Sequence, residues 1–196
     1  MIQLFIRYFK DWKMQVFPSI CIFLYVMFTG TDLYTTYLAT PDLKMEGNPI
    51  ILYFGWKWQG LLLWAFSMLV MTISFAVLSN KYILKYFENK KQNIPTNKLL
   101  FFIFFLLLVY CYHNLIASFE ATIHNYLGYR YLFSNSEGIL QKIAINYAEF
   151  YIKFDKKFGI YVSMYVVTAL ICLLGTLTAI FQVNRVKKYV QSTFST

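Results

Sequence analysis

Four long stretches of the chain contain no Asp, Glu, Lys or Arg, and they constrain the fold more than any other feature. They cover residues 14–31, 58–80, 99–119 and 158–184, with lengths of 18, 23, 21 and 27. A helix needs about 20 apolar residues to cross about 30 Å of hydrocarbon, where it satisfies its own backbone amides. The sequence therefore predicts an all-α integral membrane bundle of four transmembrane helices.

The composition agrees with a bilayer environment. Hydrophobic residues make up 59% of the chain and charged residues 14%, against about 25% charged in a soluble domain. This composition excludes a water-soluble globule, a disordered chain and a disulfide scaffold. We expect one membrane domain over residues 1–196, and its predicted helices are as follows: transmembrane helices at 14–38, 50–80, 98–125 and 158–184, and amphipathic interfacial helices at 2–13 and 137–156.

The two interfacial helices are predicted from their periodicity. At the N-terminus, Ile2, Phe5 and Phe9 share one helical side, which predicts an interfacial helix. The alternative is a cleaved signal peptide, which is disfavoured because the sequence lacks a small-residue cleavage site. In the second segment, apolar residues recur at helical spacing from Ile139 to Phe154. We expect this helix to lie on the outer leaflet or to roof the bundle, while its off-face isoleucines would mark a partner surface.

The basic residues predict how the chain crosses the membrane. With four crossings, both termini share a side, which holds eleven Lys and Arg and two acidic residues, while the other side holds seven of each. The positive-inside rule therefore predicts cytoplasmic termini in a multi-pass protein of the plasma or inner membrane. The excess positive charge indicates attraction to anionic lipids on the cytoplasmic face, and no nucleic-acid motif accompanies it.

Ionisable residues cluster toward the outer ends of the first and third predicted spans. Glu120 and His124 lie within about 20° of His113 on a helical wheel, but His113 and His124 are about 16 Å apart along the axis. Asp32 lies at the outer end of the first span, and Glu46 precedes a helix start at Asn48-Pro49. Ionisable groups in a bilayer are costly and are candidates for function.

This cluster has two interpretations. In the first, Asp32, Glu120 and His124 bind one divalent metal, zinc, iron or manganese, while Asp32 and Glu46 serve as catalytic acid or base. In the second, Asp32 bonds to neighbouring threonines, Glu46 caps a helix, and Glu120 and His124 are interfacial groups in contact with water. His113, which lies deeper, is either a proton-relay residue or a partner in an interhelical hydrogen bond.

Several chemistries are excluded by residue type. Cys21, Cys111 and Cys172 are isolated and lie inside predicted spans, so no disulfide redox pair is expected. Both histidines lie on the third span, so two helices cannot supply axial histidines to one haem. The chain also has no Walker loop, nucleophile elbow or H-E-x-x-H motif.

A short pattern resembles a known group of proteins. Asp32-x-x-x-Thr36, followed by Glu46-x-Asn48-Pro49 and a second apolar span, resembles small uncharacterised multi-pass membrane proteins that share D-x-x-x-T and E-x-N-P over about residues 28–80. The resemblance implies a helix-loop-helix unit whose Asp, Glu and Asn face inward, and the family carries no established activity. A four-span lipoprotein signal peptidase is disfavoured, because the third and fourth spans contain no aspartate.

Three functions fit these features. The first is a non-catalytic subunit or scaffold of a larger membrane complex, since the sequence carries no strong catalytic motif. The second is a metal-dependent membrane enzyme that acts at the outer leaflet. The third is a small transporter in which Asp32, His113 and Glu120 carry protons or ions.

Overall fold

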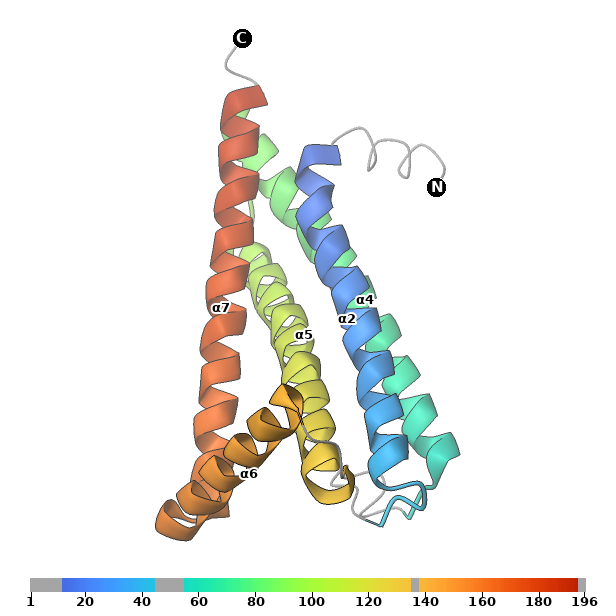
Figure 1. Cartoon of the computed structure of the whole chain (residues 1–196). Coiled ribbons are helices and arrows are strands. Elements are labelled where there is room, and N and C mark those ends of the chain that lie inside the picture. The colour runs from blue at the N-terminus through green and yellow to red at the C-terminus, as the bar shows by residue number, and fades with distance from the viewer. Residues whose placement is uncertain (1–11, 45–54, 135–137, 194–196) are drawn as a thin grey trace. The chain divides into compact units, whose positions relative to one another are not determined.

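The computed structural model describes residues 12–44, 55–134 and 138–193, and about 90% of these residues are helical, with no strand among them. The five helices are α2 (Trp12–Ala39), α4 (Trp58–Lys91), α5 (Lys98–Phe133), α6 (Ile139–Phe158) and α7 (Ile160–Thr193) (Figure 1). Residues 2–11 of the interfacial helix predicted at 2–13 lie outside the described ranges, as do the residues around Glu46, while residues 12 and 13 belong to α2.

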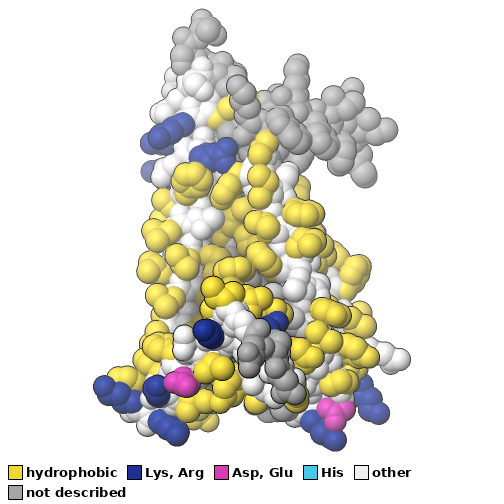
Figure 2. All heavy atoms as spheres, viewed as in Figure 1, with side chains coloured by type: hydrophobic (Ala, Val, Ile, Leu, Met, Phe, Trp, Pro, Cys, Tyr) yellow, Lys and Arg dark blue, Asp and Glu magenta, His cyan; other side chains and the backbone are white. Residues whose placement is uncertain are grey.

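Four helices are long and apolar enough to cross a membrane, which confirms the predicted fold class. The candidate spans are Val16–Ala39, Trp58–Lys91, Lys98–Phe133 and Ile160–Ser192. Large apolar side chains are exposed along all of them, including Phe23, Phe66, Leu99 and Leu170. Hydrophobic side chains cover most of the described surface in the view of Figure 2. An apolar outer surface is what lipid contact requires, since acyl chains are the solvent there.

The helices run past the ends of the uncharged stretches. α4 continues to Lys91, α5 to Phe133 and α7 to Thr193, beyond the predicted ends at 80, 125 and 184. Long basic side chains extend their charged ends to the membrane boundary, so charge does not end a helix. At the C-terminus of α7, Lys91 Nζ donates to the carbonyls of Val190 at 3.2 Å and Gln191 at 2.8 Å. A cation there satisfies carbonyls that have no partner within the helix.

The start of α4 is later than predicted, at Trp58 instead of residue 50. Residues 55–57 are not helical, and Gly55 has a φ of 62°. The indole Nε1 of Trp58 donates to the carbonyl of Pro41 at 2.7 Å, and its ring contacts Tyr37. This interaction joins the first turn of α4 to the end of α2, as expected for a tryptophan at a membrane boundary.

The chain forms two compact units, and each long helix contributes a segment to both. Unit 1 contains residues 1–25, 70–115 and 173–196, and unit 2 contains residues 26–69 and 116–172. Within unit 1, the core consists of Ile83, Leu108, Tyr112, Ala179 and Val186, from α4, α5 and α7. Within unit 2, Gln141 joins α6 to α5, since its Nε2 donates to the carbonyl of Arg130 at 3.1 Å, and Ala144 of α6 is fully buried.

Candidate functional site

Asp32, a predicted metal ligand and catalytic residue, is half-buried in unit 2 and bonded to α5. Its Oδ1 accepts a 2.8 Å hydrogen bond from Asn125 Nδ2, and the same amide donates to Thr36 Oγ1 at 3.2 Å. Asp32 and Thr36 lie one helical turn apart on α2, so one amide reaches both. The D-x-x-x-T pattern of the sequence therefore forms an interhelical hydrogen-bond clamp with Asn125.

The same two helices are joined one turn further along. Thr122 Oγ1 lies 3.0 Å from the carbonyl of Phe28 and 2.8 Å from the carbonyl of Ser118 in its own helix, so its one proton is shared between the two acceptors. The rings of Phe28 and Phe119 lie 4.9 Å apart. Thr122 and Asn125 are adjacent on the helical wheel, so α5 presents one polar strip to α2. Thr29, which lies on the same side of α2 as Asp32, has a buried hydroxyl with no hydrogen-bond partner among the described residues.

The other two predicted metal ligands, Glu120 and His124, lie on the part of α5 that meets α6. His124 Nδ1 is 3.0 Å from the hydroxyl of Tyr147, and its ring meets those of Tyr147 and Tyr151 edge-on, with centroid distances of 5.9 and 5.6 Å. Glu120 is half-buried one turn before His124 and acts on Tyr147 through its charge. The side of α5 that carries Asn125 therefore contacts α2, and the side that carries His124 contacts α6.

Tyr147 is held in its neutral form by these surroundings. Burial raises the pKa of Tyr147, and a hydrogen bond with Tyr151 and the charges of Tyr151 and Glu120 raise it further. Its hydroxyl therefore keeps its proton over the physiological range and remains able to donate to the imidazole.

No group of three or more histidine, cysteine or carboxylate side chains in the described ranges is placed to hold one metal ion. Glu46, the third carboxylate of the predicted cluster, lies outside those ranges. The metal interpretation of Asp32, Glu120 and His124 therefore stays a prediction.

His113, the predicted proton-relay residue, belongs to unit 1, whereas Asp32, Glu120 and His124 belong to unit 2. Its backbone lies at a close contact between α5 and α7. A Cβ added to Gly175 would lie 3.0 Å from the backbone N of His113 and 3.2 Å from its Cα. This contact involves the backbone of His113 and not its imidazole, so the role of His113 in proton transfer stays a prediction.

Unit 1 contains a second set of polar contacts, between residues of the apolar stretches. Gln182 Nε2 donates to Asn80 Oδ1 at 3.0 Å, with both side chains buried, and Asn114 Nδ2 donates to Thr72 Oγ1 at 2.9 Å. The thiol of Cys111 donates to the carbonyl of Thr72 at 3.3 Å. The Asn80–Gln182 pair was missed in the sequence, although a polar amide within a candidate span is a signal for interhelical bonding.

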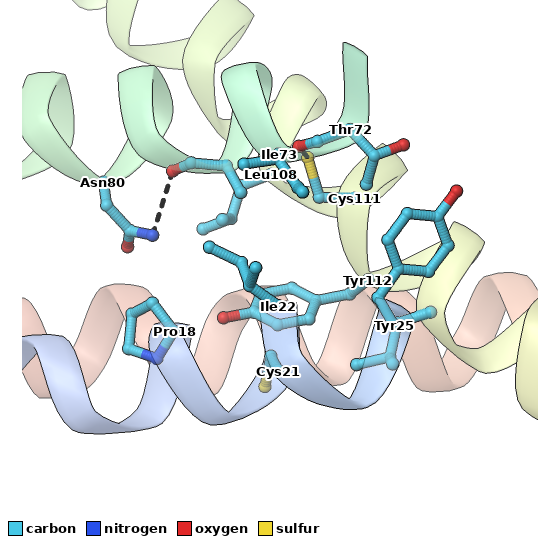
Figure 3. Close-up of a pocket in the computed structure, with 12 residues that line it drawn as sticks. Pro18, Cys21, Ile22, Tyr25, Thr72, Ile73, Asn80, Leu108, Cys111 and Tyr112 are labelled. Atoms are coloured by element: carbon cyan, nitrogen blue, oxygen red, sulfur yellow. Dashed lines mark hydrogen bonds between the residues drawn. The ribbon is translucent and has the colours of Figure 1, made fainter. Parts of the chain in front are cut away.

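A small cavity lies between α2, α4 and α5 within unit 1. Its volume is about 20 Å³, and its lining includes Pro18, Cys21, Asn80 and Tyr112 (Figure 3). In Figure 3 the Asn80 amide turns to the Ala76 carbonyl, to which it donates at 3.0 Å. A cavity of this size holds one water molecule and not a substrate.

The three cysteines, all among the described residues, form no disulfide.

Comparison with known proteins found no matching family model, no matching curated protein and no matching solved structure.

Proposed function

We propose that the chain is a non-catalytic subunit or scaffold of a larger membrane assembly. The proposal rests on the hydrogen bonds of Asp32 and His124, which are the strongest catalytic and metal-binding candidates. Asp32 accepts a hydrogen bond from Asn125, and His124 bonds to Tyr147. Both interactions join one helix of the chain to another, so these two side chains have a structural role of the kind expected in a scaffold.

The energetics of polar groups in a bilayer support this proposal. An unsatisfied polar group costs several kcal/mol in hydrocarbon, at roughly 2–7 kcal/mol per group, so polar residues in spans bind helices together. A metal ligand or proton carrier must instead exchange its partner during turnover. The amide of Asn125 bridges Asp32 and Thr36, and this arrangement suits a permanent contact.

The experiment compares two substitutions of Asp32 in the full chain. Asp32→Asn keeps an oxygen that accepts from Asn125, whereas Asp32→Leu removes it. The protein is extracted from its native membrane in mild detergent and its mass is measured by native mass spectrometry. We expect a particle of fixed composition above the 23.3 kDa of the chain. We also expect Asp32→Asn to preserve it and Asp32→Leu to reduce its yield.

Two outcomes would overturn the scaffold proposal in favour of the other functions. One is a lone chain with stoichiometric metal that is lost in both Glu120→Gln and His124→Ala, which indicates the metal-dependent enzyme. The other is proton- or ion-coupled flux in vesicles that disappears in Asp32→Asn, which indicates the transporter. A lone chain with neither property also contradicts the scaffold proposal.

We also propose that the protein resides in the plasma or inner membrane with both termini in the cytoplasm. We further propose that anionic lipids bind to its cytoplasmic face. Among the described acidic residues, only Glu88 belongs to unit 1, which contains the basic residues from Lys81 to Lys98 and from Arg185 to Lys188. Positive segments next to spans remain in the cytoplasm and attract anionic headgroups. In intact cells, an impermeant thiol reagent should modify Lys153→Cys and spare Lys187→Cys, and the reverse pattern would contradict the proposed orientation.

A further inference from the structure

α6 is chemically unlike the four long helices. It has 20 residues, includes four lysines, and is not among the candidate spans. Its packed side is defined by Gln141, Ala144, Tyr147 and Tyr151, which repeat at helical spacing. Gln141 bonds to the Arg130 carbonyl, Ala144 is fully buried, and Tyr147 and Tyr151 meet His124.

A second side of α6 is apolar and uncovered. Ile139, Ile143 and Phe150 are 76%, 46% and 62% exposed, although helical geometry puts them within about 40° of each other. We call these three residues the apolar flank. It lies about 120° around the helix from the packed side, so unit 2 does not bury it.

Four of the six charged residues of α6 occupy the sector beside the apolar flank. They are Lys142, Glu149, Lys153 and Lys156, and their centre lies about 90° from that of the flank. Asp155 lies toward the packed side, and Lys157 lies at the C-terminal end of the flank side. Lys153 and Glu149 form an ion pair at 3.0 Å. A helix that packs on protein with one side, and presents apolar and lysine-rich sectors with the others, has the pattern of an interfacial helix.

The connection to α7 fixes the depth of α6. α7, a candidate span, begins at Ile160, and only Gly159 separates it from the end of α6 at Phe158. Gly159 makes the turn with φ 88° and ψ 147°, and Ser163 Oγ donates to Asp155 Oδ1 at 2.6 Å across it. Figure 1 shows α6 turned away from the axis of α7 at their junction. The C-terminal end of α6 must therefore lie at the membrane boundary.

Aromatic residues mark the same boundary. Tyr161 and Tyr165, in the first turns of α7, are strongly exposed, and tyrosine is enriched at headgroup level. Phe150, Phe154 and Phe158 form a series of ring contacts on α6 with centroid distances of 6.0 and 4.8 Å. The ring series brings the apolar flank into continuity with the first turn of the span.

We propose that α6 is an interfacial helix whose apolar flank is immersed in the lipid bilayer. Ile139, Ile143 and Phe150 enter the boundary between headgroups and acyl chains, while Lys142, Lys153 and Lys156 reach headgroups and water. The occupant of the flank is lipid, because the Phe150–Phe154–Phe158 ring series leads from the flank to the start of a candidate span, and the neighbouring lysines match a phosphate-rich surface.

The test uses adjacent pairs of cysteine substitutions in the full-length protein. Lys142→Cys is paired with Ile143→Cys, and Glu149→Cys with Phe150→Cys, so that both flank positions tested have a charged-sector control one residue away. The protein is reconstituted into liposomes of phosphatidylcholine and phosphatidylglycerol and treated with a charged, impermeant maleimide. Unsubstituted protein gives the background of the three native cysteines, and labelling in SDS gives the total.

We expect the two flank cysteines to react about tenfold more slowly than their neighbours, because a charged reagent is excluded from apolar surroundings. A fluorophore attached in detergent at position 143 or 150 should also be quenched by brominated lipids, which tests the same contact in folded protein. The labelling fraction of Lys142→Cys measures how much protein faces outward.

Three results would overturn the proposal. Equal rates within each pair would mean that the flank faces water. Protection in native membranes that is absent in the liposomes would mean that another protein covers it. Protection that disappears as the lipid-to-protein ratio rises would mean that a second copy of the chain covers it.

Discussion

Gly175 of α7 lies against the backbone of His113 in α5, close enough that a Cβ at position 175 would be 3.0 Å from the His113 nitrogen. Ala179, one turn along α7, is fully buried in the core of unit 1. Small residues one turn apart let helix backbones approach in a membrane, where packing replaces the hydrophobic effect.

Gly175→Val should separate these helices and destabilise the protein by about 1–3 kcal/mol, the usual cost of overpacking. Unfolding in SDS–detergent mixtures, followed by circular dichroism, measures the change. The matched control is Gly128→Val in α5, because a Cβ at position 128 meets no atom within 4 Å. Equal effects of the two substitutions would show that the Gly175 contact is unimportant.

Asn80 and Gln182 should be energetically coupled. Gln182 is completely buried and donates to Asn80 at 3.0 Å. A double-mutant cycle with Asn80→Ala and Gln182→Ala should give a coupling of about 0.6 kcal/mol, and at most about 1.7 kcal/mol, as in other membrane helices. The control is a second cycle that combines Asn80→Ala with Thr178→Ala, since Thr178 bonds within its own helix. A coupling of zero for Asn80 and Gln182 would contradict the prediction.

Gly159→Ala should strain the turn between α6 and α7. With φ 88° and ψ 147°, Gly159 occupies a region that L residues rarely adopt, at a cost of about 1–3 kcal/mol. We expect faster hydrogen exchange in α6 and lower thermal stability. Gly30→Ala should be neutral or stabilising by comparison, because Gly30 is helical, has no positive φ and faces open space. Unchanged exchange in the Gly159 variant would contradict the predicted strain.

The packing of α6 should weaken at alkaline pH. Because burial and Tyr151 raise the pKa of Tyr147, the packed tyrosine binds its proton more tightly than an exposed tyrosine, whose pKa is about 10. Its contribution to stability is therefore present below about pH 10 and is lost as the pH rises further.

Hydrogen exchange of α6 between about pH 8 and about pH 11 measures this effect, after correction for the intrinsic pH dependence of exchange. Tyr147→Phe should remove part of the alkaline loss of protection, while the exposed Tyr161→Phe serves as the control. Identical profiles for the wild type and Tyr147→Phe would exclude Tyr147 as the titrating group.

The prediction that Asp32, Glu120 and His124 form one site stays a prediction, and the structure adds the hydrogen-bond partners of two of them. Asp32, Glu120 and His124 were expected near one another, and all three belong to unit 2. Asp32 bonds to Asn125, while His124 bonds to Tyr147 of α6. A helical wheel places Asn125 and His124 on neighbouring sides of α5, but it contains nothing that says which side meets α2.

The sequence alone determined the number of candidate spans and the amphipathic character of residues 139–158, because uncharged runs and helical periodicity are local properties of a chain. The tertiary structure decided which side chains meet, such as Gly175 with His113 and Gln182 with Asn80. The physical reason is that a span apolar on every side has no preferred face in lipid, so its rotation depends on close packing and on a few polar contacts with other helices.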